Sequence, residues 1–581
     1  MINRKLLLLF SITLISLMLI AMPVFADEAK YFRTYFGSGD IPSIDQALVT
    51  DFIGIQLVDE MTVGIMRQNE TTGLLEPGMA TEYSVSDDGR VYTFKLLQNV
   101  PWVRYNPETK AVEEVKDCDG NVRYVTAHDF VYGAERTLRP ETASGYAYVA
   151  NLIEGAEAYN TPVEEGEGTP VARPDFSTVG IKALDDFTIE YTFKEAGVFN
   201  LNILSMWMLH AMPSWIIDGD ACNEALGERW TETGFYQGYG PFTLEEWVHD
   251  SHLTIIANPF WPGTEFVPKP KIAGVHYSLI DTSAALAEYE AGNMDEAGIP
   301  SADYDRITSD PAFKDQIKSS TDSVGTEFLI YNEWLPPTDD VRIRKALSLA
   351  VDKEAVVKTL KEGIAAPFYI HPGVDGAPKV EDYPDLGIMY DPEAAKALID
   401  EYCKEKGIQP KDIVVTYNFN TSESRKMLAE TIQYMWQNTL GITVNLKNSE
   451  WPVFKVERQQ GLDNVYRSTW VQDYMDANNF TADVFLCGTA YQAVTDWPSK
   501  DCTDKSNPAY IEYEEVVKKA GKETDPKARA ALYARSDEII IEEEAIINPI
   551  YWYSSLVLRK PNIIAPETLT GYAHWEKWEI K

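Results

Sequence analysis

The chain has 581 residues, of which 45% are hydrophobic and 24% are charged. This balance is typical of folded globular proteins and excludes disorder over most of the chain, and the length predicts about three domains. The 90 acidic residues outnumber the 51 basic ones, and the net charge of −39 argues against binding to nucleic acids or anionic membranes. The same charge weakly favours cationic ligands.

The first 26 residues have the pattern of a secretory signal peptide. Arg4 and Lys5 form a basic start, residues 6–24 form an apolar run, and Ala26 ends a small-residue cleavage site. An uncleaved membrane anchor is the alternative, because the apolar run is long for a signal peptide. No cysteine lies near the cleavage point to accept a lipid. We therefore expect a secreted protein without a lipid anchor, either periplasmic or at the outer face of the cytoplasmic membrane.

Alternating and helical patterns follow one another after this segment, which predicts an α/β fold with mixed sheets. Period-two alternation predicts strands at 91–96, 188–193 and 442–446. Apolar periodicity and capping residues predict helices at 128–136, 341–361, 392–403 and 425–440. Gly441 separates the last helix from the last strand, as in a crossover connection between strands.

The motifs of common secreted hydrolases are missing from the sequence. It contains no Gly-x-Ser-x-Gly elbow, no His-Glu-x-x-His helix and no phosphate-binding loop. His249 and His252 have a spacing that suits a metal, but they lie in a polar turn and no third ligand is evident. We expect a surface hairpin there, no metal site and no cofactor.

The five cysteines are an odd number, so at least one is unpaired or joined to another chain. Export to an oxidising compartment would permit disulfides. Cys487 and Cys502 are the nearest pair in the sequence, with Gly, Pro and polar residues between them. We expect a disulfide that closes this loop.

Six short segments carry a resemblance to a known family, and their order is kept over nearly the whole chain. They are 75–80, 91–94, 125–132, 240–247, 258–261 and 340–353. Together they resemble the extracellular solute-binding proteins of peptide importers, the oligopeptide- and dipeptide-binding family, also called family 5. The chain departs from the family pattern at 102–123, where a short turn is expanded, and at 475–478, where a proline-containing run is replaced.

This resemblance implies a two-lobed clamp of the periplasmic-binding-protein type, with an inserted third domain. The expected division is a signal peptide at 1–26, a first lobe at 27–67, 198–322 and 546–581, an inserted domain at 68–197, and a second lobe at 323–545. Boundaries drawn from one sequence are the least reliable part of such a division, and we expect errors of about ten residues.

One segment of the second lobe bears on the ligand. In peptide-binding members of the family, an Arg precedes a Trp-x-x-Asp-Tyr motif whose Asp receives the α-ammonium of the peptide. Arg467, Trp470, Asp473 and Tyr474 match this pattern. A buried ammonium requires such a partner, since a charge-assisted hydrogen bond is about twice as strong as a neutral one. Alternatively, Asp473 caps a turn or helix that begins at Tyr474.

The resemblance implies further contacts to the peptide. Arg458 and Arg467 correspond to positions that pair with peptide C-termini in some members, although ion pairs with Glu457 or Asp463 are an alternative. Strands near 50–52 and 468–470 would bind the peptide main chain on both sides. The candidate ligand-binding residues are therefore Thr50, Asp51, Phe52, Arg458, Arg467, Ser468, Thr469, Trp470, Asp473 and Tyr474.

The sequence therefore predicts the solute-binding component of an ABC importer, a monomer that encloses short peptides and catalyses no reaction. Its expected partners are the permease and ATPase subunits, with no nucleic acid and no membrane contact except through the importer. An oligosaccharide binder of the same family is the alternative, in which aromatic rings stack on sugars and Asp473 accepts hydrogen bonds from hydroxyls. A secreted hydrolase with unrecognised carboxylates is a remote alternative.

Overall fold

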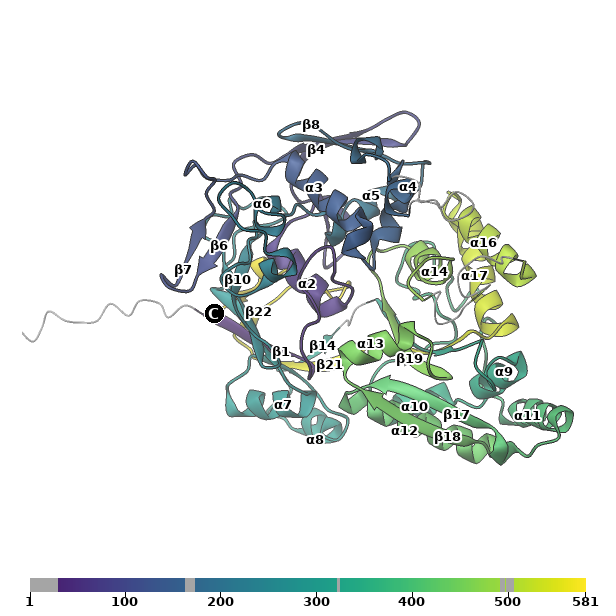
Figure 1. The fold of residues 1–581 in the computed structure, drawn as a ribbon. Helices are drawn as coiled ribbons and strands as arrows, with labels where there is room; N and C mark the ends of the chain where they lie inside the picture. Colours follow the sequence, from purple (N-terminus) through teal and green to yellow (C-terminus); the bar gives the residue numbers. More distant parts are fainter. Residues whose placement is uncertain (1–29, 162–172, 321–323, 492–496, 498–505) are drawn as a thin grey trace, which may run out of the picture.

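The computed structural model describes residues 30–161, 173–320, 324–491, 497 and 506–581. The expected signal peptide lies outside these residues. Within them, no helix is both long enough and apolar enough to cross a membrane. Figure 1 shows the inserted domain above the first lobe, with the second lobe beside them.

The first lobe is built on a four-stranded sheet. Its strand order is β1 (Tyr31–Phe36), β12 (Gly274–Leu279), β11 (His252–Ala257) and β10 (Phe242–Val248). β1 and β12 are parallel, and the other neighbours are antiparallel. The helices of this lobe are α2 (Phe52–Met61), α5 (Asn200–Ile203), α6 (Ser214–Ile217), α7 (Thr282–Ala291) and α8 (Tyr304–Ser309).

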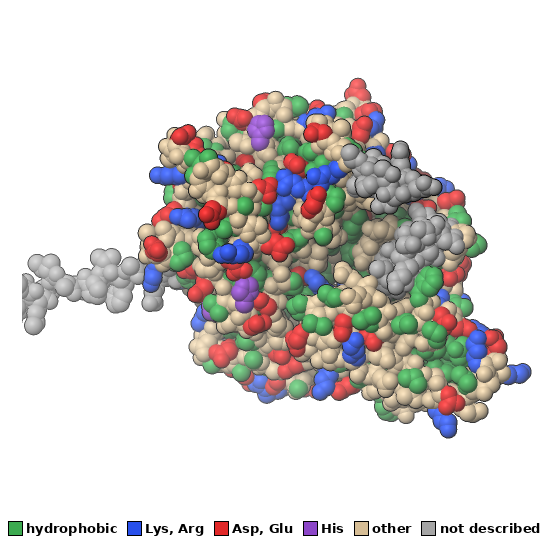
Figure 2. Space-filling model, viewed as in Figure 1, with side chains coloured by type: hydrophobic (Ala, Val, Ile, Leu, Met, Phe, Trp, Pro, Cys, Tyr) green, Lys and Arg blue, Asp and Glu red, His purple; other side chains and the backbone are tan. Residues whose placement is uncertain are grey.

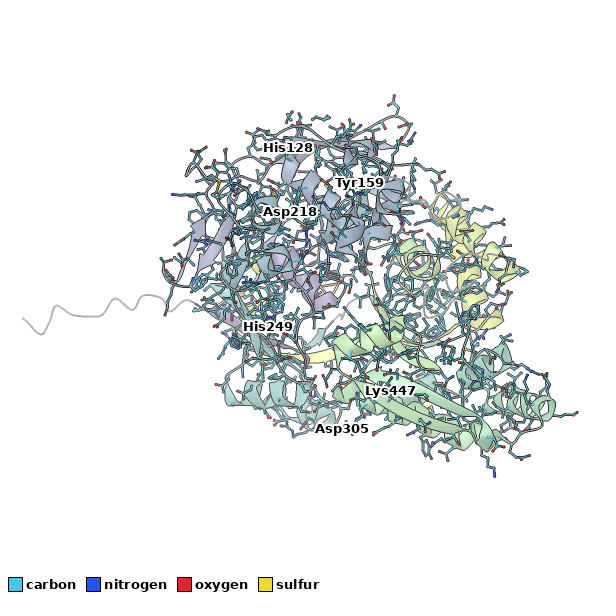
Figure 3. All side chains as sticks on the ribbon, viewed as in Figure 1. His128, Tyr159, Asp218, His249, Asp305 and Lys447 are labelled. Carbon is cyan, nitrogen blue, oxygen red and sulfur yellow. A yellow bond between two sulfur atoms is a disulfide. The ribbon has the colours of Figure 1, made fainter. Side chains whose placement is uncertain are left out.

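The hairpin predicted around His249 and His252 is confirmed as the β10–β11 connection. His249 lies on the surface, where its ring nitrogens are 2.6 Å from Asp40 Oδ2 and 3.2 Å from Glu232 Oε2 (Figure 3). The two carboxylates raise the pKa of His249 against the lowering effect of partial burial. This histidine therefore takes part in a surface ion pair.

The inserted domain contains an antiparallel four-stranded sheet. The strand order is β4 (Ala80–Val85), β5 (Val91–Leu96), β9 (Thr188–Thr192) and β8 (Ile181–Asp185), so the strands predicted at 91–96 and 188–193 are confirmed. α3 (Ala127–Leu138) contacts β8 and begins with a capping box, in which the Thr126 amide donates to Asp129 Oδ2 at 2.8 Å. The remaining elements are β2 (Met66–Gln68), β3 (Leu75–Pro77), β6 (Val103–Asn106), β7 (Ala111–Glu114) and α4 (Ala156–Asn160).

A disulfide joins the inserted domain to the first lobe. Cys118 lies in the expanded segment 102–123, and it is bonded to Cys222 of the first lobe. The two residues are 104 positions apart, so their proximity depends on the tertiary fold and was not predicted. Cys403 is free and buried, as the odd cysteine count requires. Cys487 is disulfide-bonded, and its predicted partner Cys502 lies outside the described residues.

The second lobe is built on a six-stranded mixed sheet. Its order is β16 (Ile364–Ala365), β20 (Ile547–Trp552), β15 (Gly325–Tyr331), β19 (Val465–Val471), β17 (Val414–Asn420) and β18 (Thr443–Ser449). β17 and β18 are parallel and are connected by α12 (Glu423–Leu440), which ends at Gly441 in the left-handed conformation. The predicted helix–glycine–strand crossover is therefore confirmed.

The helices of the second lobe cover this sheet and extend beyond it. They are α9 (Val341–Leu349), α10 (Lys353–Leu360), α11 (Pro392–Lys406), α13 (Trp451–Gln459), α14 (Ala477–Phe485), α16 (Pro508–Ala520) and α17 (Pro526–Glu538). The single helix predicted at 341–361 is wrong, because the chain breaks into α9 and α10 there. Asp352 causes the restart, since its carboxylate accepts a hydrogen bond from the Ala355 amide at 3.0 Å as an N-cap.

The chain passes from the second lobe to the first lobe near its C-terminus, between β20 and β21. β20 pairs with β15 of the second lobe, whereas β21 (Ser555–Arg559) pairs with β13 (Glu296–Gly298) and β14 (Ile317–Ser320) of the first lobe. Residues 547–552, which the sequence-based division gave to the first lobe, therefore lie in the second-lobe sheet. β22 (Ile563–Ile564) and β23 (Glu579–Ile580) form a final antiparallel pair.

The two lobes pack against one another. One continuous cluster of buried hydrophobic side chains includes Trp207 and Tyr572 on one side and Phe328 and Tyr474 on the other. Hydrogen bonds also cross between the lobes, including a reciprocal pair between the amides of Gln68 and Gln472 at 3.2 and 3.3 Å. The clamp is therefore closed in this structure.

Candidate functional site

A cavity of about 190 Å³ lies between the two lobes. The space-filling view is hollowed between the inserted domain above and the second lobe below (Figure 2). The predicted site residues that line the cavity are Thr50, Asp51, Phe52, Arg458, Thr469, Trp470 and Asp473. The fold thus brings together segments that are about 400 positions apart in the sequence.

Asp473 has a carboxylate that only neutral groups contact. Its Oδ2 accepts a hydrogen bond from Asn479 Nδ2 at 3.0 Å, and the Tyr146 hydroxyl lies 3.4 Å from its Oδ1. No cation among the described residues pairs with it. Burial raises the pKa of Asp473 to about 7, although the hydrogen bond from Asn479 lowers it. A cationic ligand group would supply the missing charge and restore the ionised form.

The alternative role for Asp473, as the cap of a helix beginning at Tyr474, is not formed. α14 begins at Ala477, and its N-cap is Asp476, whose carboxylate accepts from the Asn478 amide at 2.8 Å. Both oxygens of Asp476 also lie 2.7 Å from Arg529 Nη2. The segment 475–478 therefore supplies a helix cap and a buried ion pair.

Arg458 lines the cavity without a carboxylate partner among the described residues. Its Nη1 donates to Ser468 Oγ at 3.1 Å and to the Tyr491 hydroxyl at 3.0 Å, and its guanidinium lies 4.4 Å from the centre of the Tyr491 ring. Hydroxyls and an aromatic face hold a guanidinium in place without neutralising it. Arg458 is therefore available to a ligand carboxylate.

The ion pairs proposed as an alternative for Arg458 are formed by another residue. Glu457 Oε1 and Asp463 Oδ2 each lie 3.0 Å from Lys447 Nζ, which Figure 3 labels on the second lobe. Lys447 is not among the residues that line the cavity.

Arg467 and Tyr474 do not line the cavity. Arg467 is buried and donates to both oxygens of Glu327, at 2.7 and 2.6 Å. The Tyr474 hydroxyl donates to Asp483 Oδ2 at 2.6 Å. Ser468 is also absent from the lining and acts on the site by positioning Arg458. Arg467, Ser468 and Tyr474 were predicted to contact the ligand. In this structure they bond to other side chains of the second lobe and do not line the cavity.

The expected strand at 50–52 is wrong, because α2 begins there. Asp51 is the N-cap of this helix, and its Oδ1 accepts a hydrogen bond from the Gly54 amide at 3.1 Å. The backbone of Asp51 itself is extended, but the residues after it form the hydrogen bonds of α2 and not those of a strand. The first lobe therefore presents a helix N-terminus and the ring of Phe52, which stacks on Tyr572 at 4.5 Å.

The other predicted strand is present and has an open edge. β19 pairs with β15 along its whole length, from Val465 to Val471. On its other side it pairs with β17 only at Val465 and Tyr466. Within the part of the chain that the structure describes, no strand pairs with this edge beyond Tyr466, and the edge lies at the cavity. The Thr469 carbonyl of this stretch accepts a hydrogen bond from the Tyr491 hydroxyl at 2.9 Å. An extended peptide could pair with this edge where Tyr491 leaves or shares that carbonyl.

Sequence reasoning missed the residues that reach the cavity from distant segments. Lys455 Nζ donates to Thr50 Oγ1 at 2.8 Å and lies 3.6 Å from Asp51 Oδ2, so it joins the two lobes. Its position three residues before Arg458 places both side chains on one face of a helix, and this spacing could have indicated it. The other missed lining residues are Ile55, Gly145, Tyr146, Trp451, Gln459, Val471, Ala490, Tyr491 and Tyr572.

Two groups of side chains in the described residues have a spacing that suits a metal ion. In the first group, which also contains Asp220, Cys118 and Cys222 form a disulfide with one another and so offer no thiolate to a metal. In the second, Glu70, Glu76 and His574 surround the ammonium of Lys577, which lies 2.8 Å from Glu70 and 3.3 Å from Glu76. A lysine therefore occupies the place of a cation in this cluster.

Comparison with known proteins assigns this architecture to one family. The family model described as "Bacterial extracellular solute-binding proteins, family 5 Middle" matches residues 75–492. The chain is 28% identical over 494 residues to the dipeptide-binding protein DppE of Bacillus subtilis, covering 84% of this chain and 80% of DppE. It is 28% identical over 526 residues to the periplasmic murein peptide-binding protein MppA of Escherichia coli, covering 89% of this chain and 87% of MppA.

Solved structures share the fold. The oligopeptide-binding protein OppAIV of Borrelia burgdorferi superposes with a TM-score of 0.78 at 24% identity, covering 95% of this chain and all of that one. A structure of E. coli MppA gives 0.76 at 25% identity, covering 95% and 99%. The unliganded open form of MppA gives only 0.59, although it covers 95% of this chain and 98% of its own. This difference agrees with the closed arrangement of the lobes described above.

Proposed function

The chain belongs to the bacterial extracellular solute-binding proteins of family 5, and from this premise we propose that it captures short peptides for an ABC importer. The names of its relatives support a peptide ligand, because DppE binds dipeptides and MppA binds murein peptides. The observation that carries the proposal is the Asp473 carboxylate, which faces the cavity between the lobes with no cationic partner among the described residues.

The charges of the cavity fit a peptide with free ends. The α-ammonium binds Asp473, and a ligand carboxylate binds Arg458, which meets only hydroxyls and rings in the described protein. Lys455 is already matched with Asp51. The remaining pair of opposite charges corresponds to a zwitterion, and burying either charge without a partner would be costly.

The main chain of the peptide extends β19 through the open edge beyond Tyr466. Backbone pairing does not depend on the side chains of the peptide, so it permits a broad range of sequences. The ligand contacts both lobes and stabilises the closed clamp, and the closed surface is presented to permease and ATPase subunits. We propose a secreted monomer that has no lipid anchor, uses no cofactor and catalyses no reaction.

Mass spectrometry of the small molecules released when the purified protein is denatured tests the ligand class. A closed clamp retains its ligand through purification when dissociation is slow. We expect short peptides with unmodified N-termini in the released fraction. Release of oligosaccharides, or of molecules that carry no amine, would overturn the peptide assignment while leaving the family and the clamp in place.

A further inference from the structure

A second, smaller cavity adjoins the ligand cavity. It has a volume of about 30 Å³, and it shares Ile55, Asp473 and Tyr572 with the larger cavity. This space holds one group of the size of a water molecule or an ammonium. Its other lining residues include Asp59, Arg67 and His210.

Asp59 gives this small cavity a second uncompensated carboxylate. In the described part of the chain, no side chain or backbone amide makes a hydrogen bond or ion pair with the Asp59 carboxylate. The neighbouring Arg67 donates from Nη2 to the backbone oxygen of Asp59 at 3.1 Å. Burial raises the pKa of Asp59 to about 7, although the charge of Arg67 lowers it. Asp59 and Asp473 therefore face one space, which Arg67 also lines, and neither carboxylate forms an ion pair with a side chain of the described residues.

Buried polar atoms on the wall of this cavity also lack partners. His210 is 2% exposed, and its Nε2 has no hydrogen-bond partner, while its Nδ1 lies 2.9 Å from Thr62 Oγ1. Arg67 is 5% exposed, and its Nε is likewise unpartnered. Thr62 Oγ1 donates to the Val58 carbonyl, so His210 Nδ1–H donates to Thr62 and His210 Nε2 is left as an unpaired acceptor. An unpaired acceptor in the interior costs free energy, so His210 Nε2 indicates a hydrogen-bond donor, such as an ammonium or a water, in the cavity. Arg67 Nε–H only donates, and an ammonium would not satisfy it.

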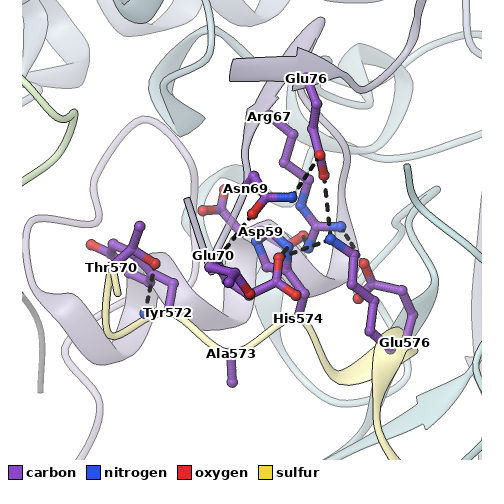
Figure 4. Close-up of polar contacts among 12 residues, drawn as sticks. Asp59, Arg67, Asn69, Glu70, Glu76, Thr570, Tyr572, Ala573, His574 and Glu576 are labelled. Carbon is purple, nitrogen blue, oxygen red and sulfur yellow. Dashed lines mark hydrogen bonds and ion pairs between the residues drawn. The ribbon is translucent and has the colours of Figure 1, made fainter. Parts of the chain in front are cut away.

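The cations near the cavity are already neutralised. Figure 4 shows Arg67 and the residues around it. Arg67 Nη1 lies 2.7 Å from Glu576 Oε1, and its Nη2 lies 3.3 Å from Glu60 Oε1; both carboxylates are fully buried. Lys577 is held by Glu70 at 2.8 Å. Burial and the charge of Glu576 raise the pKa of Glu60 well above its usual range, so Glu60 is not counted as a negative charge here. Glu576, Glu70, Asp59 and Asp473, when ionised, still outnumber Arg67 and Lys577, and this excess favours a positive group in the small cavity.

We propose that the small cavity is a second cationic subsite, in which Asp59 binds a side-chain ammonium carried by the first residue of the peptide. This inference rests on the proposed peptide function and names the preferred ligand class as peptides with a lysine-like N-terminal residue. The α-ammonium binds Asp473 at the junction of the two cavities. The side chain then passes Ile55 and Tyr572 and places its ammonium between Asp59 and Asp473.

Calorimetry with two matched tripeptides tests this subsite. Lys-Ala-Ala and norleucine-Ala-Ala have first side chains of similar length, but only the first carries an ammonium. At about pH 7.5, where peptide α-amines are largely protonated, we expect the wild-type protein to bind Lys-Ala-Ala at least about tenfold more tightly. In Asp59→Asn, the two affinities should agree within about threefold, with that of norleucine-Ala-Ala unchanged. Glu76→Gln alters a carboxylate of the same network outside the cavity and should keep the preference.

The outcomes separate this subsite from the proposed function. Equal affinities in the wild-type protein would mean that the small cavity holds water only, and they would overturn the inference while leaving peptide binding intact. A preference for Lys-Ala-Ala that persists in Asp59→Asn would overturn the role of Asp59. Failure of both peptides to bind would overturn the peptide function itself. The wild-type comparison needs no variant, so equal affinities would overturn the subsite even if Asp59→Asn does not fold.

Discussion

Arg458 and Arg467 were both predicted to bind a ligand carboxylate, yet the structure uses them in opposite ways. Arg467 is buried and forms a two-bond ion pair with Glu327, which is itself fully buried. Arg458 lies on the cavity wall and contacts only hydroxyls and aromatic rings. The comparison teaches that a charge compensated within the protein stabilises the fold, whereas a charge left with neutral partners is available to the ligand.

The same contrast separates two carboxylates of one loop. Asp476 is paired with Arg529 and caps α14. Asp473 faces the cavity with only Asn479 and Tyr146 as donors. Sequence proximity therefore does not decide the role of a charged residue in this protein, and the identity of its partners does.

The largest effect should come from breaking the compensated pair. Glu327→Gln leaves Arg467 and its neighbour Arg425, 3.5 Å away from Glu327, without their buried countercharge. We expect the free energy of unfolding to fall by about 4 kcal/mol, measured by urea denaturation of the unliganded protein. The control is Glu401→Gln, which removes an exposed partner of Arg342 and should cost less than about 1 kcal/mol. Equal losses in the two variants would contradict the assigned structural role of Glu327.

A smaller effect, on affinity and not on stability, should follow from changing the uncompensated arginine. Arg458→Met removes the countercharge for a ligand carboxylate. We expect calorimetry to show affinity for unmodified peptides falling about thirtyfold, or about 2 kcal/mol. Affinity for the same peptides with amidated C-termini should change little, because they carry no carboxylate to lose. Equal weakening of both peptide forms would place Arg458 in a purely structural role.

The smallest effect concerns pH. The pKa of Asp473 in the unliganded protein is raised to about 7, and an ammonium in contact with it would lower that pKa again. Below pH 7 a proton must therefore leave before the ligand binds, so affinity should fall by up to about tenfold per pH unit as the pH decreases. Above pH 7, and until the peptide amine loses its proton near pH 8, this carboxylate should contribute no pH dependence. Calorimetry across this range checks the slope, and an affinity that rises on acidification would contradict it.

Much of the architecture could be predicted from local patterns. Period-two alternation located β5 and β9, and the helix–Gly441–strand pattern located the α12–β18 crossover. The break between α9 and α10 was missed because apolar periodicity continues across it. Asp352 ends that continuity through a single capping hydrogen bond. A cap inside a periodic segment is a weak signal beside a long apolar face.

The candidate site was predicted only where a motif carried it. Asp473 and Trp470 were located by the Trp-x-x-Asp-Tyr pattern and line the cavity. Tyr572 could not be found in this way, because the fold brings it to the cavity from a segment about 100 positions away. Lys455 lies outside the motif, and only its spacing from Arg458 on the same helix could have indicated it. The motif also could not separate Arg458 from Arg467, since the partner that neutralises Arg467 lies 140 positions away.

The most direct test of the central claim measures how the affinity of a tripeptide depends on its α-ammonium and on Asp473 together. Calorimetry would compare a free-amine peptide with its N-acetylated form on the wild-type protein and on Asp473→Asn. Asp483→Asn, which alters the neighbouring buried carboxylate held by Tyr474, serves as control. We expect acetylation to weaken binding to the wild type and the control about 100-fold, or about 3 kcal/mol, and to make no difference in Asp473→Asn. Equal affinity of the wild type for both peptide forms would contradict the account.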